Sequence, residues 1–293
     1  MTGIRPLLLA LGIVVLSGCI SVPGADRLVV SEENGVMTSR NAACGAPAPP
    51  LARSQGHKGV LDPADLRLLI WNVHKAQNAA WTEDFRRLGT SRDILLLQEA
   101  HLTQPFTTTI GGSGFRWSMA HAFTYAGAGT GVLTASRTAA SGACLTRQVE
   151  PLLRLPKSAL ITRYSVEGAD GDLMLANVHG INFSLGTGRF RRQLEDVVNA
   201  VRSHEGPLVL AGDFNDWSER RSEILESLTT ELRLKRLDLS LDGRSRHFGK
   251  PVDHVFYRDL DVVDARAVKV TTSDHNPMLV TFRVPGRHEE RPQ

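Results

Sequence analysis

The chain of 293 residues is long enough for one large domain or two small ones. With 42% hydrophobic and 22% charged residues, its composition excludes an intrinsically disordered chain and a long coiled coil. A formal net charge of only +3 argues against a dedicated nucleic-acid binder with a strongly basic surface, although local basic patches remain compatible with it.

The first 18 residues have the pattern of a bacterial secretory signal. Arg5 supplies the positive charge, an apolar run covers Pro6 to Leu16, and Ser17-Gly18-Cys19 follows. Small residues before a cysteine resemble a lipoprotein signal, so we expect residues 1–18 to be removed and Cys19 to carry lipid. The alternative is an uncleaved anchor, although the run is shorter than the ~20 residues of a full span. Both interpretations predict an exported domain tied to a bacterial membrane.

Residues 19–63 show no useful helix or strand periodicity, and Ala46-Pro47-Ala48-Pro49-Pro50 has the composition of a stiff linker. We therefore expect a flexible tether over this range. If Cys19 carries lipid, Cys44 and Cys144 remain as an even pair in an oxidising compartment, which favours a disulfide between tether and domain. Two unpaired thiols are the alternative. The cysteine spacing is not that of a structural zinc site.

From Leu66 onward, short apolar runs alternate with loops, which predicts one domain over residues 64–285 and a tail over 286–293. The predicted strands are 66–71, 93–98, 131–136, 158–166, 173–178, 208–211, 254–257 and 278–284. Residues 111–131 are expected to form loops between short strands. Helices are predicted at 79–88, 188–204 and from Ser218 to about Leu228. Many strands and few long helices indicate an α+β fold with packed sheets.

Polar side chains stand beside these strands, most of them directly after one. They are Asn72, Glu99, His179, Asp213, Asn215, Asp253, Asp274 and His275. Taken singly, each could cap a turn or carry a surface charge. Because strand ends of packed sheets lie close in space, the recurrence of the pattern favours one common site.

Six segments in this order resemble the motifs of the endonuclease/exonuclease/phosphatase superfamily. They are WN (71–72), LLLQE (95–99), NVHGIN (177–182), AGDFN (211–215), VDHVF (252–256) and SDHNP (273–277). Three further segments, RLPKSALITRY (154–164), HGINFSLG (179–186) and HNPMLV (275–280), are similar to one bacterial branch of it. The superfamily includes DNase I-like nucleases, apurinic endonucleases, sphingomyelinases and inositol polyphosphate 5-phosphatases. The resemblance implies a four-layer α/β/β/α sandwich (DNase I-like) and metal-assisted cleavage of a P–O bond.

The resemblance also implies a metal site. Glu99 would be the principal ligand of Mg²⁺ (or Mn²⁺), with Asn72 beside it and Asp274 nearby, because carboxylate and amide oxygens suit a hard cation. The chain departs from some relatives two residues after Asn72, where His74 and then Lys75 stand in place of an acidic residue. This weakens the case for a second metal ion. The two residues would contact phosphate instead, unless they are an ordinary surface pair.

The remaining implied roles are catalytic. His275, oriented by Asp253, would act as a general base or as a cation that stabilises phosphate. Asp213, held by Asn215, would orient or deprotonate the attacking water. His179 and Asn182 are similar to residues of the family's phosphate-contact segment.

The substrate is left open among three phosphate esters. Nucleic acid is favoured by Arg189, Arg191 and Arg192, which follow the His179 loop, although they could equally be a solvated helix start. A phospholipid is favoured by the membrane tether, but the sequence indicates no long exposed aromatic hairpin of the kind that a lipid hydrolase would insert. A small phosphorylated metabolite is the third candidate. A non-catalytic, lipid-tethered binding module on the same scaffold is the alternative outside enzymes. We expect a monomer.

Overall fold

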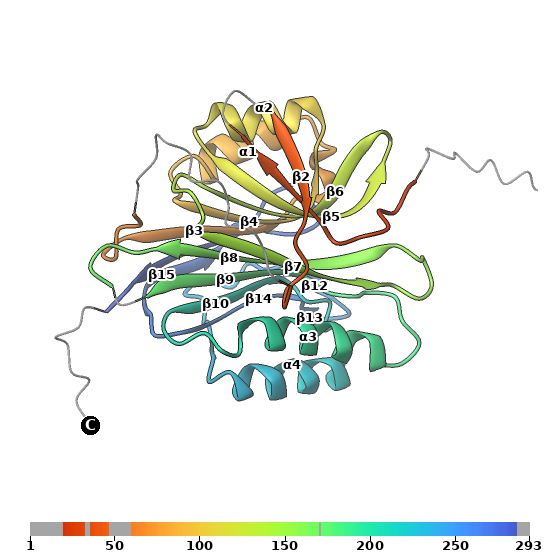
Figure 1. The fold of residues 1–293 in the computed structure, drawn as a ribbon. Coiled ribbons are helices and arrows are strands. Elements are labelled where there is room, and N and C mark those ends of the chain that lie inside the picture. Colours follow the sequence, from red (N-terminus) through yellow and green to blue (C-terminus); the bar gives the residue numbers. More distant parts are fainter. Residues whose placement is uncertain (1–19, 33–35, 47–59, 170, 286–293) are drawn as a thin grey trace, which may run out of the picture.

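The structure is a computed structural model, and it describes residues 20–32, 36–46, 60–169 and 171–285. Two β-sheets pack face to face, with helices on both outer faces (Figure 1). This four-layer α+β sandwich confirms the predicted architecture. The predicted signal, the lipid-attachment residue Cys19 and the tail 286–293 lie outside the described residues. Within the described part of the chain, the helices are all too short or too polar to cross a bilayer.

The first sheet has eight strands in the order β15-β16-β3-β4-β6-β5-β1-β2. In chain order they are β1 (Arg27–Ser31), β2 (Met37–Asn41), β3 (Leu66–Asn72), β4 (Ile94–His101), β5 (Arg116–Tyr125), β6 (Ala128–Ser136), β15 (Asp261–Ala267) and β16 (Met278–Arg283). Only β3 and β4 pair in parallel in this sheet. The strands in its middle are apolar on both faces, as burial on both sides requires.

The second sheet has six strands in the order β11-β14-β10-β9-β8-β7. They are β7 (Gly142–Val149), β8 (Pro156–Ser165), β9 (Asp172–His179), β10 (Leu208–Asp213), β11 (Lys235–Arg236) and β14 (Asp253–Arg258). β9 and β10 are its parallel pair. A separate small hairpin is formed by β12 (Arg246–His247) and β13 (Lys250–Pro251).

Helices cover the outer face of each sheet (Figure 1). They are α1 (Trp81–Leu88) and α2 (Gln104–Gly112) on the first sheet, and α3 (Gly188–Val201) and α4 (Glu219–Glu231) on the second. A short 3₁₀ turn, η2 (His74–Ala76), follows β3. In α3 the residues at helical spacing, Phe190, Leu194, Val197, Val198 and Val201, form the buried stripe against the sheet.

The largely apolar core between the two sheets contains a buried polar bridge of two amides. Nε2 of Gln98 donates to Oδ1 of Asn177 at 2.6 Å, and Nδ2 of Asn177 donates to the carbonyl of Leu133 at 3.0 Å. Both amides are fully excluded from solvent. Because an unsatisfied buried amide is costly, this bridge favours one relative position of the sheets. Gln98 directly precedes Glu99, so the bridge also supports the end of β4 that carries Glu99.

The flexible tether predicted over 19–63 is wrong for much of its length. β1 pairs with β5 and β2 with β1, so this segment extends the first sheet, and Leu28 is fully buried there. The sequence signal is weak because β2 is mostly exposed and has no apolar alternation. The predicted disulfide is present: Cys44 bonds to Cys144 of β7, with their Cα atoms 4.9 Å apart. Residues 47–59 lie outside the described residues.

The stretch 111–131 also differs from its predicted loops. It contains most of the β5–β6 hairpin, which continues the sheet from β4 to β1. Its frequent small residues have a packing reason in one case: a Cβ at Gly131 would lie 2.0 Å from the carbonyl oxygen of Ala120. Glycine here marks a close approach of two strands and not a loop.

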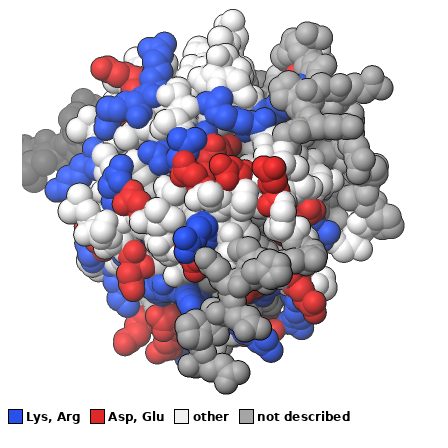
Figure 2. Space-filling model, turned by 90° about the vertical axis from the view of Figure 1, so that its left-hand side faces the viewer, with Lys and Arg blue, Asp and Glu red and all other residues white. Residues whose placement is uncertain are grey.

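The end of the sandwich at which β3 begins and β16 ends carries basic and acidic side chains side by side (Figure 2). Arg67 pairs there with Asp65 and Asp93, and Arg283 pairs with Asp261. Alternating charges do not form a surface of one sign, so this end is a poor footprint for a polyanion.

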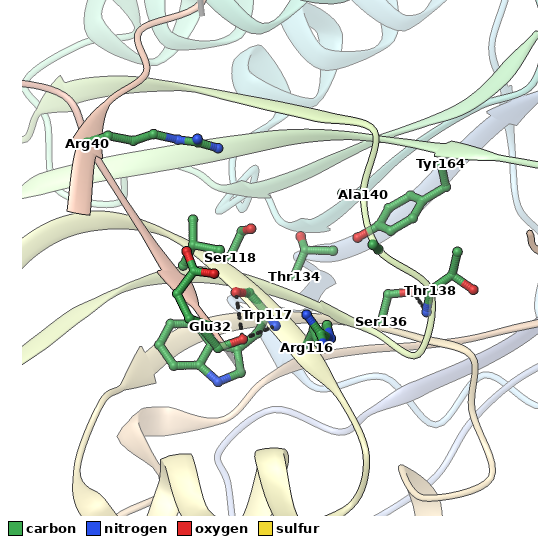
Figure 3. A pocket seen from close by; sticks show the side chains of 13 residues that line it. Glu32, Arg40, Arg116, Trp117, Ser118, Thr134, Ser136, Thr138, Ala140 and Tyr164 are labelled. Atoms are coloured by element: carbon green, nitrogen blue, oxygen red, sulfur yellow. Dashed lines mark hydrogen bonds between the residues drawn. The ribbon is translucent and has the colours of Figure 1, made fainter. Parts of the chain in front are cut away.

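A small cavity lies toward the same end, where β5 begins and β6 ends (Figure 3). Its volume is about 60 Å³, and its walls carry the hydroxyl groups of Ser118, Ser136, Thr138 and Tyr164. Burial raises the pKa of Tyr164, so its phenol stays neutral. A volume of this size suits a few water molecules, and none of the strand-end residues of the predicted site lines the cavity.

Candidate active site

Side chains from both sheets meet at the opposite end of the sandwich, where the parallel strands end. β3 runs parallel to β4, and β9 runs parallel to β10, so each pair ends together. β14 begins at this end because it is antiparallel to β10, with Asp213 opposite Asp253. The residues brought together are Asn72, Glu99, His179, Asp213, Asn215, Asp253 and His275.

His275 is held between two buried carboxylates. Its Nδ1 lies 2.8 Å from Oδ2 of Asp253, and its Nε2 lies 3.8 Å from Oδ2 of Asp213. The predicted hydrogen bond to Asp253 is thus present. Burial alone would lower the pKa of His275, but the charges of Asp253 and Asp213 outweigh it and raise the pKa to about 10. The ring is therefore an imidazolium at neutral pH.

Asp213 is fixed by contacts from both sheets. Its Oδ2 accepts a hydrogen bond from Nδ2 of Asn72 at 3.0 Å, and its Oδ1 accepts one from the backbone N–H of Asn215 at 3.1 Å. Nε2 of His179 lies 3.5 Å from Oδ2. Asn215 has a φ of +52° and is itself held by a bond from Nδ2 to the carbonyl of Gly180 at 3.2 Å. A buried carboxylate held in this way can orient a reactant with little reorganisation.

Glu99 leaves regular strand geometry at a β-bulge. The register of β4 against β6 shifts between Leu97 and Ala100, and Glu99 has a φ of +52°, which residues other than glycine rarely adopt. The bulge turns the side chain toward the site, where Oε2 lies 2.5 Å from Nζ of Lys75 and Oε1 lies 3.8 Å from Nε2 of His179. Backbone strain of this kind clusters at functional positions.

Two lysines surround the Glu99 carboxylate. Lys157 of β8 lies 4.0 Å from Oε1, and its Nζ donates to Nε2 of His179 at 2.7 Å. Burial raises the pKa of Glu99, whereas His179, Lys157 and Lys75 lower it, to a net value of about 2. Burial, together with Lys157, lowers the pKa of His179 to about 4. At neutral pH His179 is therefore uncharged, and the two lysines supply the positive charge that keeps Glu99 ionised.

Carboxylate oxygens at this end of the sandwich suit a hard divalent cation. Glu99 offers an ionised carboxylate, and Nε2 of His179 lies 3.8 Å from its Oε1 and 3.5 Å from Oδ2 of Asp213. The amide of Asn72 donates to the same Asp213 oxygen. A bound ion would replace Lys75 as the partner of Glu99. A second set, Asp213, Asp253 and His275, places its ligand atoms within 4.8 Å of one another. That set fits a metal less well, because a ligating histidine must be neutral and His275 is protonated.

Glycines permit the close backbone packing beneath the site. A Cβ at Gly180 would lie 2.2 Å from the carbonyl oxygen of Phe214, and a Cβ at Gly212 would lie 2.1 Å from that of Val178. Gly212 also has a φ of +138°. A larger residue at either position would force apart the strand ends that carry His179 and Asp213.

Buried Arg221 braces the loops behind the site. Its guanidinium donates to the carbonyls of Ile181, Asn182 and Asn215, at 2.6 to 2.9 Å. Its plane also lies over the ring of Trp217. Burial lowers the pKa of Arg221, but the carbonyl oxygens satisfy its donors. Arg221 lies three residues after the N-cap Ser218 of α4, and its side chain turns inward to these carbonyls.

The other predicted residues lie toward the edge of the site. Oδ1 of Asn182 accepts a hydrogen bond from Nε1 of Trp217 at 3.0 Å, and Arg189 is exposed on the first turn of α3. Nδ1 of His74 lies 3.6 Å from Asp274, and about half of each side chain is exposed. The metal role of Asp274 and the phosphate contacts of His74, Asn182 and Arg189 stay predictions.

The sequence reasoning missed three features at the site. Lys157 was not recognised, because its approach to His179 depends on the β8–β9 register. His247 stacks on His275, with ring centroids 5.2 Å apart, and no motif indicated it. A second buried histidine–carboxylate pair, His254 with Asp216 at 2.9 Å, lies behind the site.

A four-layer sandwich with carboxylates, amides and histidines at converging strand ends defines the DNase I-like class of proteins. More narrowly, the chain belongs to the endonuclease/exonuclease/phosphatase family, whose sequence model matches residues 69–275. Its relatives include a UPF0294 protein of Yersinia enterocolitica, 41% identical over 74% of this chain and 84% of that protein.

Solved structures share the fold at low sequence identity. An endonuclease/exonuclease/phosphatase protein of Beutenbergia cavernae matches with a TM-score of 0.59 and 18% identity, over 76% of this chain and 72% of its own. The human Nocturnin catalytic domain, solved with a bound sulfate anion, matches with a TM-score of 0.59 and 19% identity, over 78% and 97%. At these identities the likeness concerns the fold alone.

Proposed function

We propose that this protein hydrolyses a phosphodiester by attack of water at phosphorus, with the help of Mg²⁺ or Mn²⁺. The observation that carries the proposal is the buried imidazolium of His275 between Asp253 and Asp213, close to an ionised glutamate. A scaffold without chemistry has no need for this set, because burying charged groups costs stability. The sulfate bound to the Nocturnin domain, a tetrahedral anion like phosphate, is compatible with the same chemistry.

The charge state of His275 decides between the two roles that the family resemblance left open, general base and phosphate-stabilising cation. An imidazolium with a pKa of about 10 cannot accept a proton at neutral pH, so His275 acts as the cation that stabilises negative charge on phosphate. Asp213 is then the group that orients the attacking water and takes its proton. Asn215 and Asn72 hold this carboxylate in place, and Asp253 fixes the ring of His275.

Glu99 and Asn72 would hold the divalent ion. When bound, the ion neutralises the phosphate and the departing oxygen. Lys157 and neutral His179 form a hydrogen-bonded pair beside Glu99, and we assign them the binding of a phosphate oxygen.

Hydrolysis of bis(4-nitrophenyl) phosphate tests this function without assuming a natural substrate. We expect turnover that needs Mg²⁺ or Mn²⁺ and stops with a chelator. Asp213→Asn should lower turnover at least about 10²-fold. The matched control is Asp216→Asn, because Asp216 is an equally buried aspartate paired with a histidine. Absence of any metal-stimulated turnover in the folded wild type would favour the non-catalytic binding module.

We keep nucleic acid as the first natural substrate to test, supported by exposed Arg189, Arg191 and Arg192 near the site. A phospholipid or a small phosphorylated metabolite is the second candidate. Metal-dependent cleavage of DNA, RNA and phospholipid by wild type and Glu99→Gln, compared in one panel, distinguishes them. Cleavage of DNA or RNA that Glu99→Gln retains would point to a contaminating nuclease.

We also propose that the protein is an exported, monomeric lipoprotein held at a bacterial membrane through Cys19. The support is the sequence of residues 1–19 and the disulfide between Cys44 and Cys144, which suits an oxidising compartment. Cys19→Ser should release the domain from the membrane fraction of cells. Retention of the variant would favour an uncleaved anchor. Sedimentation of the soluble variant tests the monomer.

A further inference from the structure

An arc of exposed apolar side chains borders the candidate active site. Leu185 and Phe248 are 88% and 86% exposed, and more than half of Leu152, Leu153 and Phe183 is exposed. We name these five residues the apolar rim. Exposed side chains of this size on neighbouring loops mark a contact surface more often than a solvated one.

The rim comes from three loops that contacts hold side by side. Leu152 and Leu153 lie in the β7–β8 turn, where Oε1 of buried Glu150 accepts hydrogen bonds from the backbone of Asn182 and of Phe183 at 2.8 and 2.7 Å. This joins the β7–β8 turn to the loop that carries Phe183 and Leu185. The rim is therefore built on fixed positions.

The third loop joins the rim through Trp217. Nε1 of Trp217 donates to Oδ1 of Asn182 at 3.0 Å, and the ring of Trp217 lies 5.4 Å from that of Phe248. Phe248 is the tip of the β12–β13 hairpin, and the preceding residue, His247, stacks on His275. The rim thus begins directly beside the catalytic histidine.

Phe248 is held in an unfavourable backbone conformation. Its φ is +50°, and Gly249 after it has a φ of +81°. Asparagine or aspartate is the usual residue before glycine in a turn with two positive φ values, and a large side chain there is unusual. The hairpin presents an aromatic ring to solvent at the expense of local stability, which indicates a contact that the ring makes elsewhere.

Arginines without a carboxylate partner accompany the rim. Arg154 follows Leu153, and Arg189, Arg191 and Arg192 begin α3 directly after the Leu185 loop. All four are exposed, and among the described residues none of them forms an ion pair. Apolar side chains beside unpaired cations are the pattern of surfaces that insert into the headgroup region of an anionic bilayer.

We propose that the rim docks this protein onto an anionic phospholipid surface, with the mouth of the candidate site facing the headgroups. Nucleic acid fits the rim less well, because bases stack on aromatic faces and three of the five rim residues are leucines. The docking does not depend on hydrolysis. Among the described residues, the far end of the sandwich carries alternating charges in place of such a set (Figure 2).

A site-specific probe tests the docking in the full chain, including residues 1–19. In a Cys19→Ser background, Leu185→Cys is labelled with the fluorophore NBD, whose emission rises and shifts to the blue in an apolar environment. Val263→Cys, 62% exposed on β15 at the far end, is the matched control. We expect the shift at 185, but not at 263, with vesicles that contain phosphatidylglycerol, and a smaller one with phosphatidylcholine alone or at high salt.

Substitutions in the apolar rim then measure how much the rim contributes to vesicle affinity. Leu152→Ser with Leu153→Ser should weaken vesicle affinity about tenfold or more, and Val262→Ser with Val263→Ser should leave it unchanged. Arg189→Gln should weaken it about fivefold. These substitutions are on exposed residues, so thermal unfolding should stay as in the wild type.

Three outcomes would overturn the proposal. They are an unchanged probe at 185 with every vesicle, equal shifts at 185 and 263, and a shift at 185 with single-stranded DNA but not with vesicles. Hydrolysis of soluble bis(4-nitrophenyl) phosphate should be equal in wild type and in the leucine variants. A failure of docking is therefore distinct from a failure of the proposed hydrolysis.

Discussion

Replacing Asp253 by asparagine is the sharpest test of the proposed mechanism. The amide keeps the shape of the side chain and one acceptor oxygen, but it removes the charge 2.8 Å from Nδ1 of His275. Without that charge and its hydrogen bond, the pKa of His275 falls from about 10 toward the ordinary value of about 6.5, because burial then opposes only the remaining charges of Asp213 and Asp274. The substitution therefore removes the imidazolium at neutral pH while Glu99, the expected metal ligand, is untouched.

The expected magnitude follows from this pKa. At pH 7.5 a group with a pKa of about 10 is almost fully protonated, whereas one with a pKa of about 6.5 is protonated in roughly one molecule in ten. The loss of the imidazolium lowers turnover about tenfold, and poorer orientation of the ring lowers turnover about tenfold again. We expect turnover of Asp253→Asn to fall about 10²-fold at pH 7.5, with Mn²⁺ affinity close to that of the wild type.

The raised pKa also predicts the direction in which activity and stability change with pH. The wild type should stay active up to about pH 10 and lose activity as His275 deprotonates, and the variant should lose activity from about pH 6.5 upward. Because the pKa is raised in the folded state, His275 stabilises the fold fully below about pH 6.5, and this contribution is lost as pH rises to about 10. Unfolding at several pH values should show this loss in the wild type and less of it in the variant.

Asp216→Asn is the matched control, because Asp216 also pairs with a buried histidine, His254, at 2.9 Å. This substitution makes the same chemical change at a position away from the proposed reacting groups. It should alter stability without moving the alkaline limb. Turnover of Asp253→Asn within threefold of the wild type, with an unmoved alkaline limb, would refute the reasoning. Asp253 would then be a structural residue.

Three further predictions concern the metal ligand, its lysine partner and the disulfide. Glu99→Gln should lower Mn²⁺ affinity more than about tenfold by calorimetry, and an unchanged affinity would exclude Glu99 as the principal ligand. Lys75→Met should instead raise Mn²⁺ affinity, because it removes an ammonium that competes for Glu99 at 2.5 Å; a lower affinity would contradict this competition. Cys144→Ser should lower the free energy of unfolding by about 2–4 kcal/mol, because its bond with Cys44 spans a sequence separation of 100; denaturant titration measures this, and an unchanged midpoint would mean that the bond does not stabilise the domain.

The strands that carry the site could be predicted because their signals are local. Leu66–Asn72 and Leu208–Asp213 are apolar runs that end in a polar residue, and burial on both faces explains both properties at once. β1 and β2 could not be predicted in this way. Only Leu28 is fully buried in the pair, and the strands owe their structure to the edge of β5, a partner about 90 residues away in the sequence.

The convergence of the strand-end residues could be predicted from the sequence, but their electrostatic environment could not. The bulge that turns Glu99 toward Lys75 depends on the pairing of β4 with β6, which no local pattern encodes. The approach of Lys157 to His179 likewise depends on the register of β8 against β9. Register is a property of the assembled sheet, and a shift of one residue would turn Lys157 to the other face.

Two histidines in the same cavity are driven to opposite charge states. His179 has an ammonium at 2.7 Å and is neutral, while His275 has one carboxylate at 2.8 Å, a second at 3.8 Å, and is charged. Divergent pKa values of neighbouring groups identify which one can give and which one can take a proton. His179 has its Nε2 lone pair engaged by Lys157, and His275 has none free, so neither histidine can act as the base at neutral pH. Under the proposed hydrolysis, Asp213, between the two rings, is left as the acceptor of the water proton.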